Sequence, residues 1–208
     1  MLTRSKDRKV ANSVTKSGNP NIANSFGLPA GKAYSCPDQT EFCGKICYAG
    51  KLEKIYKGVR NNLTANFDAL KDAEYIEQYV LLDSMITAFE LECEKKNADK
   101  EFRIHWDGDF FSDSYTRAWS SVIASHSNVQ FWVYTRVLAS AMVLNMANHP
   151  NLGLYFSADE NNMGFAKVAK SKGINIAFVG KTFAEGKALF PKATKCPENN
   201  KALPLISE

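Results

Sequence analysis

The sequence lacks the features that mark several common protein classes. Its 208 residues contain no apolar run near the ~20 residues that cross a bilayer, and Met1–Lys9 has no signal-peptide core. No G-x-G-x-x-G, P-loop or G-x-S-x-G motif occurs. These absences argue against a membrane protein, an exported protein, a common nucleotide-binding fold or a serine hydrolase. We therefore expect a cytoplasmic protein.

Cysteine is also scarce, and its placement is uneven. Three of the five cysteines, Cys36, Cys43 and Cys47, fall within twelve residues. In a reducing compartment such a cluster is more typical of thiols or metal ligands than of disulfides. Thiolates bind iron-sulfur clusters or zinc, and Lys45 and Lys51 favour the deprotonated form. The pattern predicts a metal site, with a 4Fe-4S cluster preferred over zinc.

The two remaining cysteines have different contexts. Cys93 lies on the apolar stripe of a predicted helix, which indicates a buried structural thiol. Cys196 precedes Pro197, as ferredoxin-type ligands do. If the loop triplet acts alone, a four-iron cluster keeps one iron open for a substrate or cofactor. If Cys196 joins it, four thiolates close the site as structural zinc or an electron-transfer cluster.

The apolar pattern beyond residue 100 alternates between strand and helix. Four strands are predicted, over Phe102–Trp106, Val129–Tyr134, Leu152–Phe156 and Ile174–Val179. Helical patterns cover Tyr75–Lys95, the segment after the N-cap Ser112, Leu138–Asn148, and the region of Phe165, Val168 and Ala169. The apolar stripe of the first of these helices comprises Ile76, Tyr79, Val80, Leu82, Ile86, Phe89 and Cys93. Such alternation is typical of βαβ units with a parallel sheet.

The number of these units suggests the architecture. With Lys32–Cys36 as a first strand and Ala193–Cys196 as a last, there are about six βα units. We therefore predict an α/β fold of the open partial (βα)6 barrel type, with mostly parallel strands, because a closed eight-unit barrel typically needs ~250 residues. A doubly wound sheet is the competing layout. The barrel-like domain would span 32–208, behind an irregular, extended N-terminal arm over 1–31.

The segment after the Phe102–Trp106 strand is rich in chemically active side chains. His105, Asp107 and Asp109 alternate, so in a strand they would share one face, and Gly108 would let the backbone approach a ligand. One interpretation is a cofactor-binding rim for an amino-acid-like group. Another is a metal-dependent nuclease or phosphoesterase site. The third is a buried polar network.

Further polar residues follow the next strands, at the edge where parallel α/β folds bind ligands. Arg136 would be a catalytic phosphate or carboxylate clamp if it faces the rim, or a surface ion pair if it does not. Ser157 and Asp159 could hydrogen-bond the ribose hydroxyls of a cofactor, although Asp159 also suits a helix N-cap.

The basic residues are concentrated near the N-terminus. Residues 1–60 hold eleven Lys and Arg against four Asp and Glu, while residues 61–208 are net acidic. A basic segment of this kind attracts phosphates, so nucleic acid is a possible partner beside an unidentified substrate. A solvated basic face is the simpler interpretation.

Several motifs together resemble a known family. Asn24–Gly31, Ser35–Ala49 with the three cysteines, Arg103–Ser112 and Phe131–Arg136 are similar to the bacteriophage "gene product eighty-eight" domain, over about residues 20–197. The resemblance implies a partial barrel like that of radical S-adenosylmethionine enzymes. It implies Cys36, Cys43 and Cys47 as cluster ligands and places Gly108-Asp109 at the motif that binds the methionine amine. A phage-encoded protein would act in the host cytoplasm.

Overall fold

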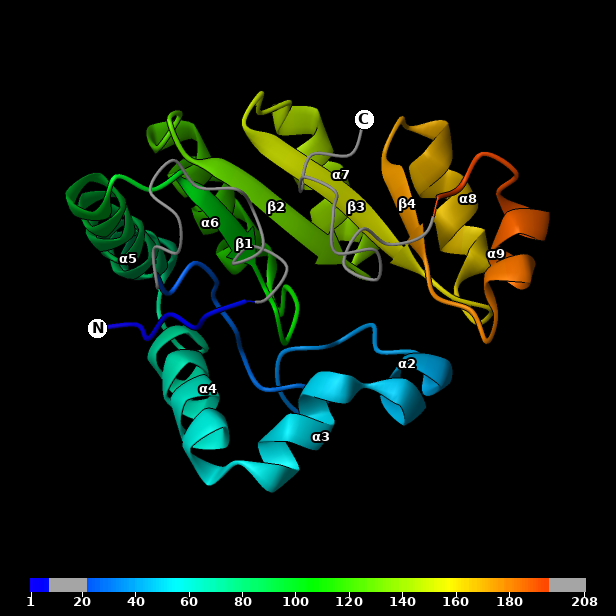
Figure 1. Cartoon of the computed structure of the whole chain (residues 1–208), viewed down its shortest axis with the longest axis horizontal. Coiled ribbons are helices and arrows are strands. Elements are labelled where there is room, and N and C mark those ends of the chain that lie inside the picture. Colours follow the sequence, from blue (N-terminus) through cyan, green and yellow to red (C-terminus); the bar gives the residue numbers. More distant parts are fainter. Residues whose placement is uncertain (8–21, 195–208) are drawn as a thin grey trace.

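The computed structural model describes residues 1–7 and 22–194 and has an α/β fold built on a parallel sheet (Figure 1). Its four strands are β1 (Glu101–Ile104), β2 (Gln130–Thr135), β3 (Leu152–Ala158) and β4 (Asn175–Phe178), in the order β1-β2-β3-β4. Every neighbouring pair is parallel. The predicted α/β class with parallel strands and the approximate positions of these four strands are thus confirmed.

Five helices accompany the sheet: α5 (Tyr75–Lys96), α6 (Asp113–Ser125), α7 (Leu138–Ala147), α8 (Met163–Ser171) and α9 (Phe183–Leu189). Helix α5 packs on α6, α6 on α7 and α7 on α8, so these four form one row. Right-handed crossovers between strands that are adjacent in both sequence and space place the helices on one face. The doubly wound alternative requires a reversal of strand order, and the described strands contain none.

The core lies between the sheet and this row of helices. It is formed by alternate strand residues such as Phe102, Phe131 and Phe156, which pack with Trp119 and other apolar side chains. The N-cap prediction for α6 is confirmed, because the Ser112 hydroxyl accepts a hydrogen bond from the Tyr115 amide at 3.1 Å. No helix in the described part of the chain is both long and apolar enough to span a membrane.

The edge of the sheet differs from the prediction. The expected first strand, Lys32–Cys36, is a turn in which the Cys36 amide bonds the Gly31 carbonyl at 3.1 Å. Residues 24–28 of the predicted arm run beside β1 instead, with Phe26 N–H donating to Arg103 O at 3.1 Å. Phe26 and Leu28 are fully buried. The strand prediction was wrong because Gly31, at φ +112°, begins a turn that exposes the residues after it.

The predicted sixth unit receives no support from the described residues. Ala193 lies outside any strand, and Cys196 lies beyond the described range. Two helix stripes also need correction. Ile76 and Val80 on α5 and Phe165 and Val168 on α8 are exposed, so these four positions were wrong. The other predicted positions Leu82, Ile86, Phe89 and Cys93 in α5 and Ala169 in α8 are buried as expected, and Met85 and Ala166 join them. The buried position of Cys93 is therefore confirmed.

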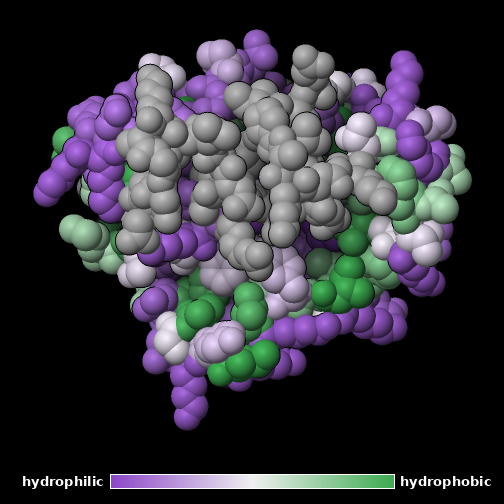
Figure 2. Space-filling view, viewed as in Figure 1, coloured by the Kyte–Doolittle hydropathy of each residue, from purple (hydrophilic) through white to green (hydrophobic). Residues whose placement is uncertain are grey.

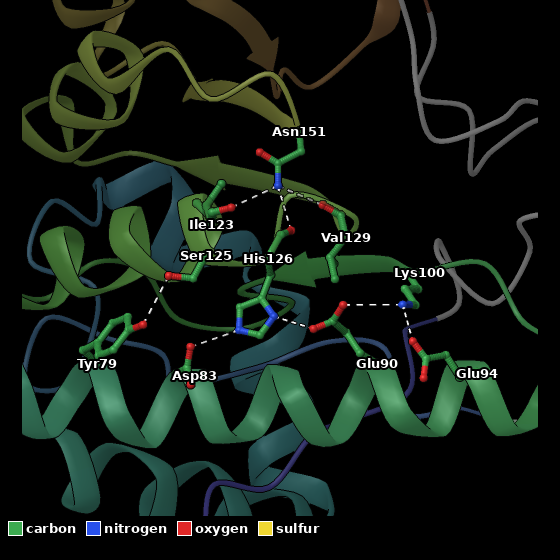
Figure 3. Close-up of polar contacts among 10 residues, drawn as sticks. All are labelled: Tyr79, Asp83, Glu90, Glu94, Lys100, Ile123, Ser125, His126, Val129 and Asn151. Carbon is green, nitrogen blue, oxygen red and sulfur yellow. Dashed lines mark hydrogen bonds and ion pairs between the residues drawn. The ribbon is translucent and has the colours of Figure 1, made fainter.

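A histidine joins α5 to the end of α6 (Figure 3). The two ring nitrogens of His126 face Glu90 Oε2 at 2.5 Å and Asp83 Oδ1 at 3.1 Å, both on α5. Lys100 lies 3.5 Å from Glu90, and the Asn151 side chain donates to the carbonyl of His126 at 3.1 Å. These contacts fix the α6–β2 turn against the long helix.

Three further helices, α2 (Glu41–Ile46), α3 (Tyr48–Ile55) and α4 (Lys57–Leu70), lie across the carboxyl ends of the strands (Figure 1). Tyr48 Oη donates to the Trp106 carbonyl at 3.2 Å, just past β1, and Thr40, the N-cap of α2, donates to Asp159 just past β3 at 2.5 Å. The cysteine segment is thereby positioned over the edge at which parallel sheets bind ligands.

Candidate functional site at the carboxyl ends of the strands

Asp109 and Arg136 form the centre of a buried polar network at this edge. Asp109 Oδ1 accepts from the Thr135 hydroxyl at 2.6 Å and from the Phe110 amide at 2.8 Å, and Oδ2 accepts from the Arg136 amide at 2.8 Å. Burial raises the pKa of Asp109 to about 6, and these three donors oppose the rise. The carboxyl group therefore ties the β1 loop to the end of β2.

Arg136 continues the network to β3. Its Nη1 donates to Asp159 Oδ2 at 2.5 Å, and Asp159 is completely buried. The same oxygen accepts from Thr40, while Asp159 Oδ1 accepts from the Asn161 amide at 2.9 Å. Arg136 thus faces the rim and forms a buried pair rather than a surface one. Asp159 is not a helix N-cap, since Asn162 occupies that position for α8.

Cys43 and Cys47 approach this network from α2 and α3. Burial raises the pKa of the Cys43 thiol, and the neighbouring Arg136 guanidinium lowers it, while Cys47 and Asp159 act on the same thiol as nearby negative groups. Cys47 is the N-cap of α3, and its Sγ accepts from the Gly50 amide at 3.3 Å. Cys43 therefore lies beside Arg136, and Cys47 lies near Cys43.

Cys36 lies on the other side of Asp109. Burial is the main reason that the pKa of its thiol rises to about 12, and the nearby Asp109 and Asp107 carboxylates add to the increase. All three cysteines of the loop are free thiols. The structure thus places Cys36 next to Asp109 and Cys43 next to Arg136, with Cys47 near Cys43.

The described residues contain no group of three His, Cys, Asp or Glu side chains arranged to hold a metal ion. This finding covers the loop cysteines and the predicted His105, Asp107 and Asp109 set. The donor chemistry of the three thiols still fits an iron-sulfur cluster. Cys196, the expected fourth ligand, lies outside the described residues.

His105 is directed away from the network. Strand β1 ends at Ile104, and His105 adopts φ +59°, so the expected strand alternation with Asp107 and Asp109 does not occur. Its Nε2 lies 2.8 Å from Tyr115 Oη, and its ring packs among aromatic side chains. Burial lowers the pKa of His105 to about 3. The ring is therefore a neutral core group, as in the buried-network interpretation.

Asp107 and Gly108 occupy a third environment, against the turn at residues 28–35. Burial, reinforced by the neighbouring Glu53 carboxyl, raises the pKa of Asp107 to about 8. One of its oxygens accepts from the Gly108 amide at 2.8 Å, and the other is buried without a hydrogen-bond partner. A Cβ on Gly108 would lie only 2.4 Å from Ser35 Oγ. Gly108 is therefore packed against Ser35 and Leu28 of the protein itself, where a ligand was expected.

Ser157 lies on β3, half-buried, and its carbonyl accepts from the Asn162 side chain at 3.1 Å. Two residues of the site, Thr40 and Glu53, were not predicted from the sequence. Thr40 and Asp159 are separated by 119 residues, so no local pattern could pair them. Thr135 could be identified from the sequence, because it ends strand β2 and directly precedes Arg136.

Comparison with known proteins gives a clear relationship. The family model for Gene product 88 matches residues 1–208, the whole chain. The chain belongs to this family. The Gene 88 protein of Mycobacterium phage L5 is 53% identical over 211 residues, covering 100% of this chain and 88% of the relative. The Gene 88 protein of Mycobacterium phage D29 is 54% identical and covers 99% and 88% respectively.

The family assignment confirms the resemblance noted from the motifs and places the chain among bacteriophage proteins. No solved structure matches this chain. The family name carries no activity, so function has to be argued from the residues at the carboxyl ends of the strands.

Proposed function

We propose that this Gene product 88 protein is an iron-sulfur protein whose 4Fe-4S cluster is bound by Cys36, Cys43 and Cys47. The observation that supports it is the gathering of three free thiols around the buried Asp109–Arg136 network at the ligand-binding edge of a parallel sheet. Thiolates are the usual ligands of such clusters, and Arg136 would balance part of their negative charge.

Cluster binding would require the three sulfurs to move closer together, and the local packing allows this. Helix α2, all of whose residues are described, buries none of them, and α3 buries only Ala49. The segment is attached to the sheet through a few hydrogen bonds, chiefly those of Thr40 and Tyr48. Metal binding commonly drives the final folding of its ligand segment. A cysteine segment that packs loosely beside a buried hydrogen-bonded network could rearrange in this way when a cluster binds.

We further propose that the site resembles that of radical S-adenosylmethionine enzymes, on an open partial barrel. The unreversed order of four parallel strands supports this layout. Cys36, Cys43 and Cys47 would hold the cluster and leave one iron without a cysteine ligand for the cofactor, and the cluster would supply an electron for cleavage of that cofactor. On this proposal Asp109 and Ser157 would bind the cofactor, whereas Gly108 packs against Ser35 and Leu28. Asp159 is completely buried and would act by positioning Arg136. The substrate is not assigned.

The test is anaerobic reconstitution of the full chain with iron and sulfide, followed by metal analysis and absorption spectroscopy. We expect about four irons per chain, a brown chromophore, and loss of both when Cys36, Cys43 or Cys47 is replaced by Ser. Cys93→Ala is the matched control, because that thiol is buried in α5, and it should retain the cluster. A protein that takes up neither iron nor sulfide would refute the proposal.

Two further measurements separate the alternatives. Stoichiometric zinc without iron, lost in Cys196→Ser, would identify a closed four-cysteine structural site. Calorimetry with S-adenosylmethionine tests cofactor binding, and a reconstituted protein that does not bind this cofactor would refute the proposal of a radical S-adenosylmethionine-type site. The nuclease alternative gains no support, because His105, Asp107 and Asp109 face Tyr115, Glu53 and Arg136 respectively. Metal-dependent cleavage lost in Asp107→Ala would restore it.

A further inference from the structure

We infer that α2, α3 and α4 form a binding surface for single-stranded nucleic acid. These helices are unusually exposed for a folded domain. Ile46, Tyr48, Ile55 and Tyr56 each expose 43–67% of their surface, although they are large and hydrophobic. In soluble proteins, apolar residues gathered on an exposed surface mark interaction sites.

The surface is also strongly basic. From Lys45 to Arg60 the chain carries five Lys and Arg against a single acidic residue, Glu53. Figure 2 shows hydrophobic and hydrophilic residues interspersed over the lower part of the view, where these helices lie. Within residues 1–7 and 22–194, Lys51, Lys54 and Arg60 form no ion pair with a carboxylate. Their charges are therefore available to an anionic partner.

A cavity of about 330 Å³ lies within this surface, between the turn at residues 29–34 and the helices. Lys51, Lys54 and Arg60 line it together with the ring of Tyr34. The Tyr34 ring is partly exposed and is supported from behind by Phe67, with ring centroids 6.2 Å apart. Ligand pockets have volumes of a few hundred Å³, so the cavity is large enough for part of a nucleotide.

Cations beside an exposed aromatic ring fit a single strand better than other polyanions. The backbone phosphates of a single strand would lie against the lysines, and an unpaired base would stack on Tyr34. Duplex DNA keeps its bases paired and offers no base for stacking. An acidic polypeptide would use the charges but not the ring. Of the proposed cluster ligands, Cys43 lies within α2 and Cys47 lines the cavity. The residues that carry this inference, Lys51, Lys54, Arg60 and Tyr34, are not cluster ligands, so the inference does not depend on the cluster.

The experiment uses the full chain, purified without oxygen, and a fluorescently labelled 20-nucleotide oligo-dT followed by anisotropy. We expect binding that weakens with salt. For single strands the slope of log K against log salt is about −0.7 per phosphate contact, so removing three contacts should flatten the slope by about 2. Lys51→Glu/Lys54→Glu/Arg60→Glu should lower the affinity at least tenfold. The matched control is Lys167→Glu/Lys170→Glu/Lys172→Glu, with the same charge change at α8, and should lower it less than threefold.

Stacking is tested separately with Tyr34. Tyr34→Ala should weaken oligo-dT binding by about fivefold or more, and Tyr34→Phe should retain the affinity, because base stacking needs the ring and not the hydroxyl. Circular dichroism confirms that every variant is folded. Equal losses in the α3–α4 and α8 variants would overturn the surface assignment. Equally tight binding of duplex DNA or polyglutamate, or no binding at all, would overturn the single-strand assignment.

Discussion

A methyl group added at Gly108 should destabilise the protein strongly. Its Cβ would lie 2.4 Å from Ser35 Oγ, 2.7 Å from Leu28 Cβ and 2.8 Å from Leu28 O, and real Cβ atoms do not approach other atoms so closely. Gly108 also adopts φ +80°, a backbone conformation that is strained for residues other than glycine. Gly108→Ala must therefore displace the segment that runs beside β1.

The expected loss can be divided into two parts. Overpacking of a close-packed site costs about 1–3 kcal/mol, and the left-handed backbone costs an L-residue roughly 1–2 kcal/mol. Together they predict a decrease of about 2–5 kcal/mol in the free energy of unfolding. In a chain of this size each kcal/mol lowers Tm by about 2–4 °C. The decrease is a large part of the ~5–15 kcal/mol that stabilises a typical domain.

Two other glycines separate these parts. Gly173 adopts φ +81° but has no atom within 4 Å of its added Cβ, so Gly173→Ala should cost only the backbone part, roughly 1–2 kcal/mol. Gly164 lies in α8 with equally open space, and Gly164→Ala should be neutral or stabilise by up to ~1 kcal/mol. Urea unfolding followed by circular dichroism measures all three. A loss in Gly108→Ala no larger than that in Gly173→Ala would show that the close packing is not the reason for this glycine.

Three other predictions concern titratable groups. The free energy of unfolding of the wild type, relative to that of His105→Asn, should fall by about 2 kcal/mol from pH 7 to pH 5. The imidazole binds a proton in the unfolded chain, where its pKa is about 6.5, but not in the folded chain, where burial lowers its pKa to about 3. Urea unfolding at both pH values tests this, and a difference that does not change with pH would contradict it. Asp159→Asn should lower the free energy of unfolding by about 3–5 kcal/mol, because it leaves the buried Arg136 guanidinium without its carboxylate partner. A decrease below about 1 kcal/mol in urea unfolding would show that this ion pair contributes little to stability. His126→Ala should lower the free energy of unfolding by about 1–3 kcal/mol, because it removes the hydrogen bonds to Asp83 and Glu90. Amide hydrogen exchange in α6 should also become faster, and unchanged exchange would argue that His126 does not hold α6 against α5.

The four strands could be predicted because strands buried in a parallel sheet are short apolar runs between helices. Helix α6 could be predicted because its stripe and its Ser112 cap agree. The edge segment at residues 24–28 could not be predicted, because Asn24 and Gly27 are typical of a loop. Its backbone hydrogen-bond partners in β1 and just after it are also at least 77 residues away along the chain, as for Phe26 and Arg103. Gly27 is required there: an added Cβ would lie 2.5 Å from Trp106 Nε1.

The candidate site was predictable to the extent that it depends on topology. Asp109, Arg136 and Asp159 follow three successive parallel strands, so their convergence follows from the sheet alone. The prediction that His105 shares one strand face with Asp107 and Asp109 was wrong for a local reason. Its positive φ turns the chain at the end of β1, and strand periodicity says nothing about a residue beyond the strand. Its burial against Tyr115 is a tertiary contact that no spacing in the loop reveals.

The site consists of two parts with different rigidity, and this difference bears on how it would work. Asp109, Arg136 and Asp159 are buried and bonded to one another, so they hold a fixed geometry before any ligand arrives. The cysteines lie in turns and short helices that bury little surface. Thr40 joins the two parts, because its hydroxyl both caps α2 and donates to Asp159. A ligand that gathers the cysteines would therefore draw α2 and α3, with their basic surface, toward a network that is already in place.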